Sequence, residues 1–424
     1  MHSNLKLTHQ LSLKLLRQRH KYTMLDLLFL LLPIAAAYGW FMGYRSVKKQ
    51  QEDANNKFSR AYMTGVNFLL SNQTNKAVDL FLDIIQKQEA DPDNPDESDL
   101  QAQFEAQLTL GNLFRSKGEV DKAIRIHQNL NRSDAYSFEQ KLLTKQQLAK
   151  DFISVGFYDR AENLYILLVD EPDFAENALQ QLTQIYQKTK EWKKAINVAE
   201  KLQLLNPQDN NIPLAHYYCE EAQKVLKSDP VASEALLQQA LNVSPTCVRA
   251  SILLAEIAVM NLDYQKALNY FTNTLEQNPD YVSEIILPVQ YLYTELGQEE
   301  NFELFLIRAE QLKNNSAVEL ALIDTIEQKE GPQAAQMKLY QQIKTNRTPV
   351  LFERFIQYQI EQTTDEKSQH SLVLLQKMVN EYIKQNAEYR CTQCGYQSHK
   401  LSWCCPSCQQ WEGIKPISSF KAIH

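Results

Sequence analysis

Four cysteines in two closely spaced pairs are the residues best suited to chemistry in this chain. The pairs are Cys391-Thr-Gln-Cys394 and Cys405-Pro-Ser-Cys408, and ten residues separate them. Each pair presents two thiolates from one tight turn, and four thiolates bind one ion in a tetrahedron. Gly395 can supply the positive φ that such a turn needs. The spacing predicts one metal ion, iron or zinc, held by these four cysteines.

Two alternatives for these cysteines are a pair of disulfides and an unliganded thiol cluster. The chain has 7 cysteines, and an odd count without even spacing is not typical of a secreted disulfide framework. We therefore expect a reducing compartment. Cys404, next to Cys405, is interpreted as a spare thiol. His399 lies between the two pairs and would be a ligand only in place of a cysteine.

Motifs of other chemistry are missing from the sequence. It has no phosphate-binding glycine-rich loop, no His-Glu-x-x-His, no Gly-x-Ser-x-Gly and no dinucleotide fingerprint, and it has only 10 glycines. His127 and His216 lie in helical sequence, where packing is the simpler interpretation. Four thiolates leave no open coordination position for catalysis. The sequence therefore favours a protein that is not an enzyme.

The middle of the chain repeats a helical pattern that must position this metal site. A small residue is followed three positions later by a large apolar one and twelve positions later by alanine, as in Gly111, Phe114 and Ala123. The anchors Ala149 and Thr183 are 34 residues apart, which is the tetratricopeptide period. One helix hairpin cannot bury its apolar face, so the pattern predicts a right-handed stack of hairpins, degenerate toward its end.

Polar residues just after the small anchors should face the inner surface of such a solenoid. We predict a partner-binding groove there, while the alternative is that these side chains only keep the surface soluble. The groove candidates are Asn112, Arg115, Lys150, Gln180, Gln184 and Gln187.

An apolar run near the N-terminus predicts one transmembrane helix, residues 24–44. Residues 27–42 are uncharged, and Trp40 stands near the end of the run, as interfacial aromatics do. The basic residues that follow would stay in the cytoplasm. A cleaved signal peptide is the alternative, because the alanines at 35–37 could form a cleavage site. If translation begins at Met24, the charge asymmetry places the bulk of the chain inside.

Together these segments predict an all-α chain with a small metal-binding end. The expected order is a basic extension (1–23), a transmembrane helix (24–44), a helical neck (45–60), a tetratricopeptide-repeat solenoid (61–386) and a four-cysteine metal-binding domain (387–424). The net charge of −7 argues against a nucleic-acid partner. Tail aromatics such as Trp403 and Trp411 are expected to form the core of the metal-binding domain or its seam with the last helices.

The sequence resembles the lipopolysaccharide assembly protein B family of Gram-negative bacteria. The resemblance begins at Met24 and runs to near the C-terminus, so residues 1–23 lie outside it. The segments that carry it are 24–40 (MLDLLFLLLPIAAAYGW), 65–72 (GVNFLLSN), 108–115 (LTLGNLFR), 123–127 (AIRIH), 389–395 (YRCTQCG), 403–408 (WCCPSC) and 414–417 (IKPI). Cys404 departs from what we expect in relatives.

This resemblance implies an inner-membrane protein with one span, tetratricopeptide repeats on the cytoplasmic side and a rubredoxin-like metal domain folded against the repeats. It implies Cys391, Cys394, Cys405 and Cys408 as metal ligands. Members look like non-enzymatic regulators of lipopolysaccharide synthesis that promote degradation of the lipid A deacetylase by the membrane-bound AAA zinc protease. An inner-membrane lipopolysaccharide sensor is implied as a further partner. The alternative is electron transfer by a rubredoxin-like iron, although no flavin or nicotinamide site accompanies it.

Overall fold

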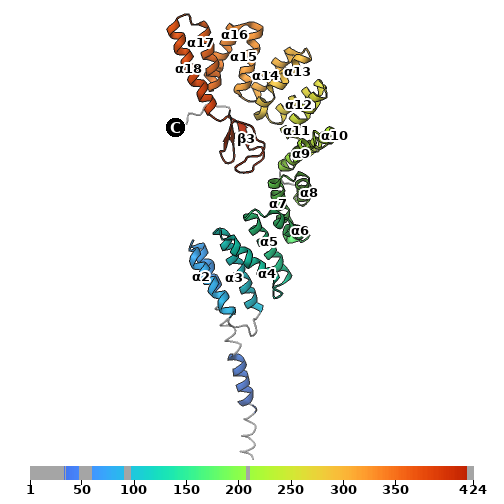
Figure 1. Cartoon of the computed structure of the whole chain (residues 1–424), viewed down its shortest axis with the longest axis vertical. Helices are drawn as coiled ribbons and strands as arrows, with labels where there is room; N and C mark the ends of the chain where they lie inside the picture. Colours follow the sequence, from blue (N-terminus) through green and yellow to red (C-terminus); the bar gives the residue numbers. More distant parts are fainter. Residues whose placement is uncertain (1–32, 34, 47–59, 90–96, 207–210, 418–424) are drawn as a thin grey trace, which may run out of the picture. The chain divides into compact units, whose positions relative to one another are not determined.

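The structure, a computed structural model, describes residues 33, 35–46, 60–89, 97–206 and 211–417. Most of them are helical, and a small three-stranded sheet follows the last helix (Figure 1). The chain divides into two compact units, Met1–Glu171 and Pro172–His424. The predicted domain boundaries at 23, 44, 60 and 386 stay predictions.

The predicted transmembrane helix lies partly outside the described residues. Residues 33 and 35–46 are helical, whereas 24–32 and 34 are not described, and neither are residues 1–23 nor most of the predicted neck. Of the helices that the structure does describe, none combines the length and the apolar character that crossing a bilayer requires. The span stays a prediction.

The first unit is a series of antiparallel helix hairpins. A helix at 60–70 is followed by α2 (Thr74–Glu89), α3 (Glu97–Ser116), α4 (Val120–Arg132), α5 (Phe138–Ser154) and α6 (Tyr158–Val169). Helix α3 packs against α4, and α5 packs against α6. The turns inside these two hairpins use Gly118 and Gly156 at φ of 82° and 79°, a conformation that glycine adopts without steric cost.

The predicted small anchors are the points where paired helices touch. A Cβ on Gly65 would stand 2.7 Å from the ring of Phe81, and one on Gly111 would stand 2.4 Å from His127 Nε2. Phe81, His127 and Tyr165 each follow a small anchor by sixteen positions and are fully buried. His127 therefore takes the position of a large core residue, which confirms the packing interpretation.

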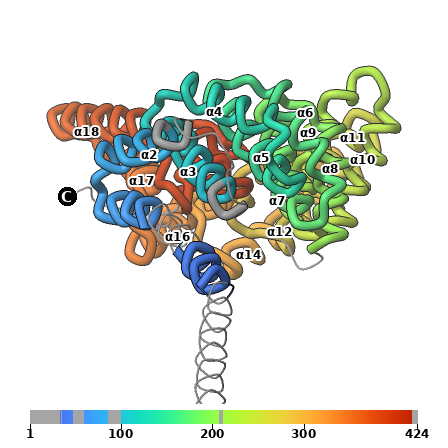
Figure 2. Tube along the Cα trace, turned by 90° about the horizontal axis from the view of Figure 1, so that it is seen from below, coloured from blue at the N-terminus to red at the C-terminus, as the bar shows by residue number. Residues whose placement is uncertain are grey.

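The second unit continues the hairpin pattern (Figure 2). Successive helices pack against one another, most extensively within the hairpins α9–α10 and α11–α12. The elements are α7 (Pro172–Thr189), α8 (Trp192–Leu205), α9 (Ile212–Val225), α10 (Pro230–Val243), α11 (Val248–Met260), α12 (Tyr264–Gln277), the 3-10 helix η1 (Pro279–Glu284), α13 (Ile286–Glu295), α14 (Glu299–Leu312), α15 (Ser316–Glu330), α16 (Pro332–Thr345), α17 (Pro349–Gln362) and α18 (Glu366–Gln385).

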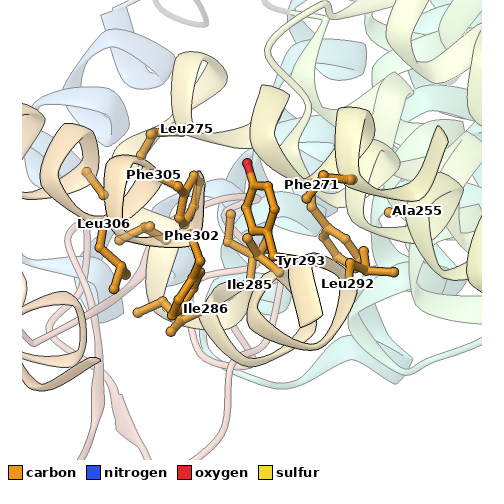
Figure 3. Close-up of a cluster of buried hydrophobic side chains, with 14 of the residues drawn as sticks. Ala255, Phe271, Leu275, Ile285, Ile286, Leu292, Tyr293, Phe302, Phe305 and Leu306 are labelled. Atoms are coloured by element: carbon orange, nitrogen blue, oxygen red, sulfur yellow. The ribbon is translucent and has the colours of Figure 1, made fainter. Parts of the chain in front are cut away.

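A continuous apolar core runs through the middle of this unit. Figure 3 shows side chains from several helices meeting there, among them Phe271, Leu292 and Phe305. Ala255 and Ala267, which the repeat pattern places at small anchor positions, are fully buried within it. The helical repeat array predicted from the sequence is confirmed, and its later, degenerate part still folds as hairpins.

A small sheet follows α18 and forms the C-terminal ribbon, residues 389–417. Its strands are β1 (Tyr389–Cys391), β2 (Gln397–Ser398) and β3 (Ile414–Pro416), in the antiparallel order β2-β1-β3. Arg390 pairs with Gln397 on one side and with Lys415 on the other. The ribbon buries few residues of its own, so it depends on other interactions for its fold.

Candidate metal centre

The two cysteine pairs of the ribbon form turns of the same geometry. The amide of Gly395 donates to the carbonyl of Cys391 over 3.0 Å, and the amide of Gln409 donates to the carbonyl of Cys405 over 2.9 Å. Gly395 and Gln409 have positive φ, 77° and 61°. The left-handed residue expected at Gly395 is confirmed, and the second turn accepts the same conformation in a glutamine.

The four sulfurs converge as a tetrahedral site requires. The Sγ atoms of Cys391 and Cys408 are 3.7 Å apart, and so are those of Cys394 and Cys405. All four lie within 4.8 Å of one another. Metal–sulfur bonds of about 2.3 Å place the corners of a tetrahedron roughly 3.8 Å apart. The residues present therefore fit one ion, and the donor set suits zinc or iron.

The surroundings of the sulfurs shift their pKa values in opposite directions. Although a backbone hydrogen bond from Gln410 acts to lower it, burial and the neighbouring sulfurs raise the pKa of the Cys408 thiol to about 12. A hydrogen bond from the backbone N–H of Tyr396 lowers the pKa of the Cys394 thiol to about 6. Cys391 and Cys405 are buried, so an ion would be enclosed on that side. With four thiolates bound, an ion has no open position for a substrate and would act structurally or by changing oxidation state.

The spare thiol Cys404 and the alternative ligand His399 stand outside this cluster. Cys404 Sγ lies 3.5 Å from Gln187 Nε2 of α7 and 3.5 Å from the carbonyl oxygen of Gln409. Burial raises its pKa to about 11, so it is a protonated thiol at neutral pH. His399 is exposed and does not join the four sulfurs.

An aromatic seam holds the ribbon against the helices. His216 of α9 is fully buried and stacks on Trp411 of the ribbon, with ring centroids 4.7 Å apart and planes 14° apart. Trp403 lies 5.9 Å from the same imidazole. Trp192 and Tyr217 meet the edges of Trp411. The seam therefore buries the apolar surface that the ribbon is too small to bury by itself.

Polar contacts fix the orientation of the ribbon in this seam. His216 Nε2 lies 3.0 Å from Glu412 Oε1. The Tyr281 hydroxyl lies 3.2 Å from the carbonyl oxygen of Glu412 and 3.3 Å from that of Ile414. Tyr389 donates to Glu284 over 2.7 Å. Burial lowers the pKa of His216, while Glu412 acts in the opposite direction.

The position of this seam corrects one expectation. The sequence left two places for the tail aromatics, the core of the metal-binding domain or a seam with the last helices. Trp411 and Trp403 do form a seam, but with α8, α9 and η1. The physical reason is complementarity: these earlier elements present Trp192, His216 and Tyr281, and packing on them buries Trp411 and half-buries Trp403.

One ion-pair cluster in the seam makes its stability depend on pH. Burial by itself would raise the pKa of Asp280, but hydrogen bonds from Lys313 and Lys415 outweigh it and lower the pKa. A carboxyl with a lowered folded pKa stabilises the fold above its unfolded value of about 3.9, and this contribution is lost as pH falls through the folded pKa.

We expect Asp280→Asn to destabilise the ribbon seam by about 1 kcal/mol at neutral pH. The difference from the native chain should shrink as pH falls below about 4. The rate of protease cleavage within the ribbon, compared between the two chains at several pH values, measures this difference in stability. Acid also protonates the four clustered cysteines, but both chains share that effect. A difference that persists unchanged at acid pH would contradict the assignment to Asp280.

In the first unit, the groove candidate Arg115 belongs to a buried network. Its guanidinium donates to Asp151 Oδ1 over 2.8 Å and to Asn112 Oδ1 over 2.7 Å. The other carboxylate oxygen of Asp151 lies 2.5 Å from His127 Nδ1. Asp151 and His127 are fully buried. Lys150 is half-buried, and burial together with Arg115 lowers its pKa.

The second-unit candidates have different surroundings. Gln180 donates to Glu176 over 3.2 Å, and Gln184 is exposed. The amide oxygen of Gln187 accepts from the Tyr217 hydroxyl over 2.9 Å and from Trp411 Nε1 over 3.4 Å. Gln187 therefore contacts the ribbon of its own chain. The partner-binding role of all six candidates stays a prediction.

Sequence reasoning missed the residues that seat the ribbon. Asp280, Tyr281 and Glu284 lie in η1 and Glu412 lies in the ribbon, and none of them follows a motif. A signal was present at His216, where an imidazole stands beside two tyrosines and a cysteine in one helix. Such a group of large semi-polar residues is more than a helix hairpin needs for its own packing.

Comparisons with known proteins agree with this architecture. Residues 389–416 match the family model described as rubredoxin metal binding domain. The chain is 63% identical over 396 residues to lipopolysaccharide assembly protein B of Haemophilus influenzae, covering 93% of this chain and 99% of the relative. It is 42% identical over 401 residues to lipopolysaccharide assembly protein B of Escherichia coli K12, covering 94% and 100%.

Solved structures of low sequence identity also match. A tetratricopeptide repeat protein from Parabacteroides merdae is 14% identical with a TM-score of 0.33, covering 63% of this chain and 98% of that one. The C-terminal part of a repeat protein from Cytophaga hutchinsonii is 15% identical with a TM-score of 0.38, covering 62% and 99%. The identity to the Haemophilus and Escherichia proteins over nearly their whole length shows that this chain belongs to the lipopolysaccharide assembly protein B family.

Proposed function

We propose that this chain is an inner-membrane adaptor that regulates lipopolysaccharide biosynthesis. In this proposal it brings the lipid A deacetylase to the membrane-bound AAA zinc protease and so promotes its degradation, and an inner-membrane lipopolysaccharide sensor adjusts that activity. The observation that carries the proposal is the similarity over almost the full chain to two proteins named for lipopolysaccharide assembly. The chain would face the cytoplasm and be anchored by residues 24–44.

The architecture supports binding rather than chemistry as the task. Stacked helix hairpins present long surfaces to other proteins. An ion bound by the four clustered cysteines would have no open coordination position for a substrate. The ribbon seats on the helices through His216 and Tyr281, so the ion would support the shape of the array. An anchor would raise the local concentration of this chain beside the protease, since both would share the membrane.

The half-life of the deacetylase tests this proposal. Pulse-chase labelling should show rapid deacetylase turnover in cells that carry the full chain and slow turnover in cells without it. Removal of residues 1–44 should slow turnover although the helical units remain folded. An unchanged half-life in cells that lack the whole chain would overturn the proposal, and an unchanged half-life for the truncated chain would overturn the anchoring step.

A photocrosslinking residue at Gln184 tests the groove directly. Gln184 is exposed on α7, and Leu204 is 82% exposed on α8, the second helix of the same hairpin. Protease or deacetylase should be captured from position 184 and not from the control position 204. Equal capture from both, or capture from neither, would contradict a groove at the first helices of the hairpins.

Electron transfer remains as a second candidate because the Cys394 sulfur is exposed, and exposure would let an electron leave the ion. Zinc has no redox chemistry. A zinc-loaded chain that still accelerates deacetylase turnover would exclude this candidate, whereas activity confined to the iron-loaded chain would favour it over the adaptor.

A further inference from the structure

A second group of metal-ligating side chains lies in the seam between ribbon and helices. His216 comes from α9, Cys247 is the N-cap residue of α11, and Glu412 comes from the turn before β3. Their ligand atoms all lie within 4.8 Å of one another. None of the three belongs to the four-cysteine cluster, and the interactions described above use only the His216–Glu412 contact.

The three side chains are enclosed as ligands of a structural ion would be. His216 and Cys247 are fully buried. The Glu412 side chain is 17% exposed, so the group is not wholly closed to solvent. Glu412 also holds a φ of 55°, which is unfavourable for a glutamate. The residue with this unfavourable φ is the one whose carboxylate contacts the His216 ring.

Two polar atoms without partners belong to this group or to the helix that carries Cys247. In the described part of the chain, buried atoms that lack a hydrogen-bond partner include His216 Nδ1 and the Ser251 hydroxyl. Ser251 follows Cys247 by four residues in the same helix. Buried polar groups are rarely left unsatisfied. The cluster therefore has the polar character of a site that holds an ion or water.

The charges of the group balance with a divalent cation. A thiolate at Cys247 and the carboxylate of Glu412 carry two negative charges, and His216 binds a cation through a neutral ring. Arg249 is paired with Glu220 over 2.9 Å, so its positive charge is compensated mainly by that carboxylate. A dication would make the buried cluster neutral, which removes the cost of desolvating separate charges.

We propose that His216, Cys247 and Glu412 form a second metal site, which takes a divalent transition-metal ion such as zinc and clasps the ribbon to the helices. Zinc binds nitrogen, sulfur and oxygen ligands together at about 2.0–2.3 Å. The His216 Nε2 to Glu412 Oε1 distance of 3.0 Å is close to the separation of two ligands on such an ion. The site joins three segments distant in sequence, so binding stabilises the docked ribbon.

Metal stoichiometry of the purified full-length chain tests this site. With the four-cysteine site filled and zinc supplied at a buffered submicromolar concentration, mass spectrometry of the eluted metal should find two ions per chain. Cys247→Ala and Glu412→Gln should each reduce this to one. With zinc kept in the four-cysteine site, cobalt at the second site should show a weaker thiolate charge-transfer band than a site of four sulfurs gives. Cys247→Ala should abolish that band.

Two matched controls separate loss of a ligand from loosening of the seam. Tyr281→Phe removes the hydroxyl that contacts Glu412 and Ile414, and Cys404→Ser removes a seam thiol outside the cluster. Both should keep two ions. A native chain that binds one ion under these conditions overturns the proposal, whatever the variants do. So does a Cys247→Ala or Glu412→Gln chain that still binds two.

Discussion

Cys391→Ser is expected to release the metal ion and unfold the ribbon. Cys391 is buried and its sulfur lies 3.7 Å from that of Cys408, so a serine removes one of four ligands and leaves a polar hydroxyl in its place. The binding energy of a structural zinc site is on the order of 10–16 kcal/mol and acts as folding energy. A ribbon this small has no core large enough to replace it.

Metal content and limited proteolysis measure this effect. The variant should contain no ion in the four-cysteine site and should be cleaved rapidly within 389–417, while the helices remain resistant. Cys404→Ser is the matched control, because Cys404 lies next to the site without joining its sulfurs, and it should keep both the ion and the resistance. A Cys391→Ser chain with native metal content and native cleavage would contradict the assignment.

Asp151→Ala is expected to destabilise the first unit by about 3–5 kcal/mol, because it removes one partner of a buried ion pair. Its carboxylate is the shared partner of the Arg115 guanidinium and the His127 ring. Without it, two polar groups stay in the core at the point where Gly111 lets α3 approach His127. For a unit of this size the melting temperature should fall by roughly 6–20 °C.

Scanning calorimetry of the full chain can measure this change as a shift of one transition. Asp134→Ala is the control. Asp134 is likewise an aspartate in an ion pair, with Lys141 over 3.3 Å, but it is fully exposed. Surface ion pairs are worth about 0–1 kcal/mol, so its melting temperature should hardly move. Equal shifts for the two variants would show that burial of the Asp151 network does not stabilise the unit.

Much of the architecture could be predicted because it depends on local spacing. The Cys-x-x-Cys pairs bring their own sulfurs together within one turn, and the ribbon joins the two turns over ten residues. Small anchors such as Gly65 and Gly111 mark where helices approach, because only a missing or small side chain leaves room for Phe81 and His127. These relations are set by residues near one another along the chain.

The groove prediction shows the limit of such reasoning. Periodicity places Arg115 and Gln187 on the first helices of their hairpins, but it does not say what approaches them. Arg115 is held by Asp151, 36 residues further on, and Gln187 by Trp411, more than two hundred residues further on. Each side chain has a partner within its own chain, which a repeat pattern does not reveal.

The sequence by itself determined the four-thiolate site, the helical repeats and the family, since each of these rests on residue types at short, fixed spacings. Only the tertiary structure decided where the ribbon lies and what surrounds it. His216, Cys247, Tyr281 and Glu412 come from four separate segments, and their meeting depends on how the hairpins stack. The physical reason is that stacking and aromatic burial act between surfaces, and a surface exists only after the chain has folded.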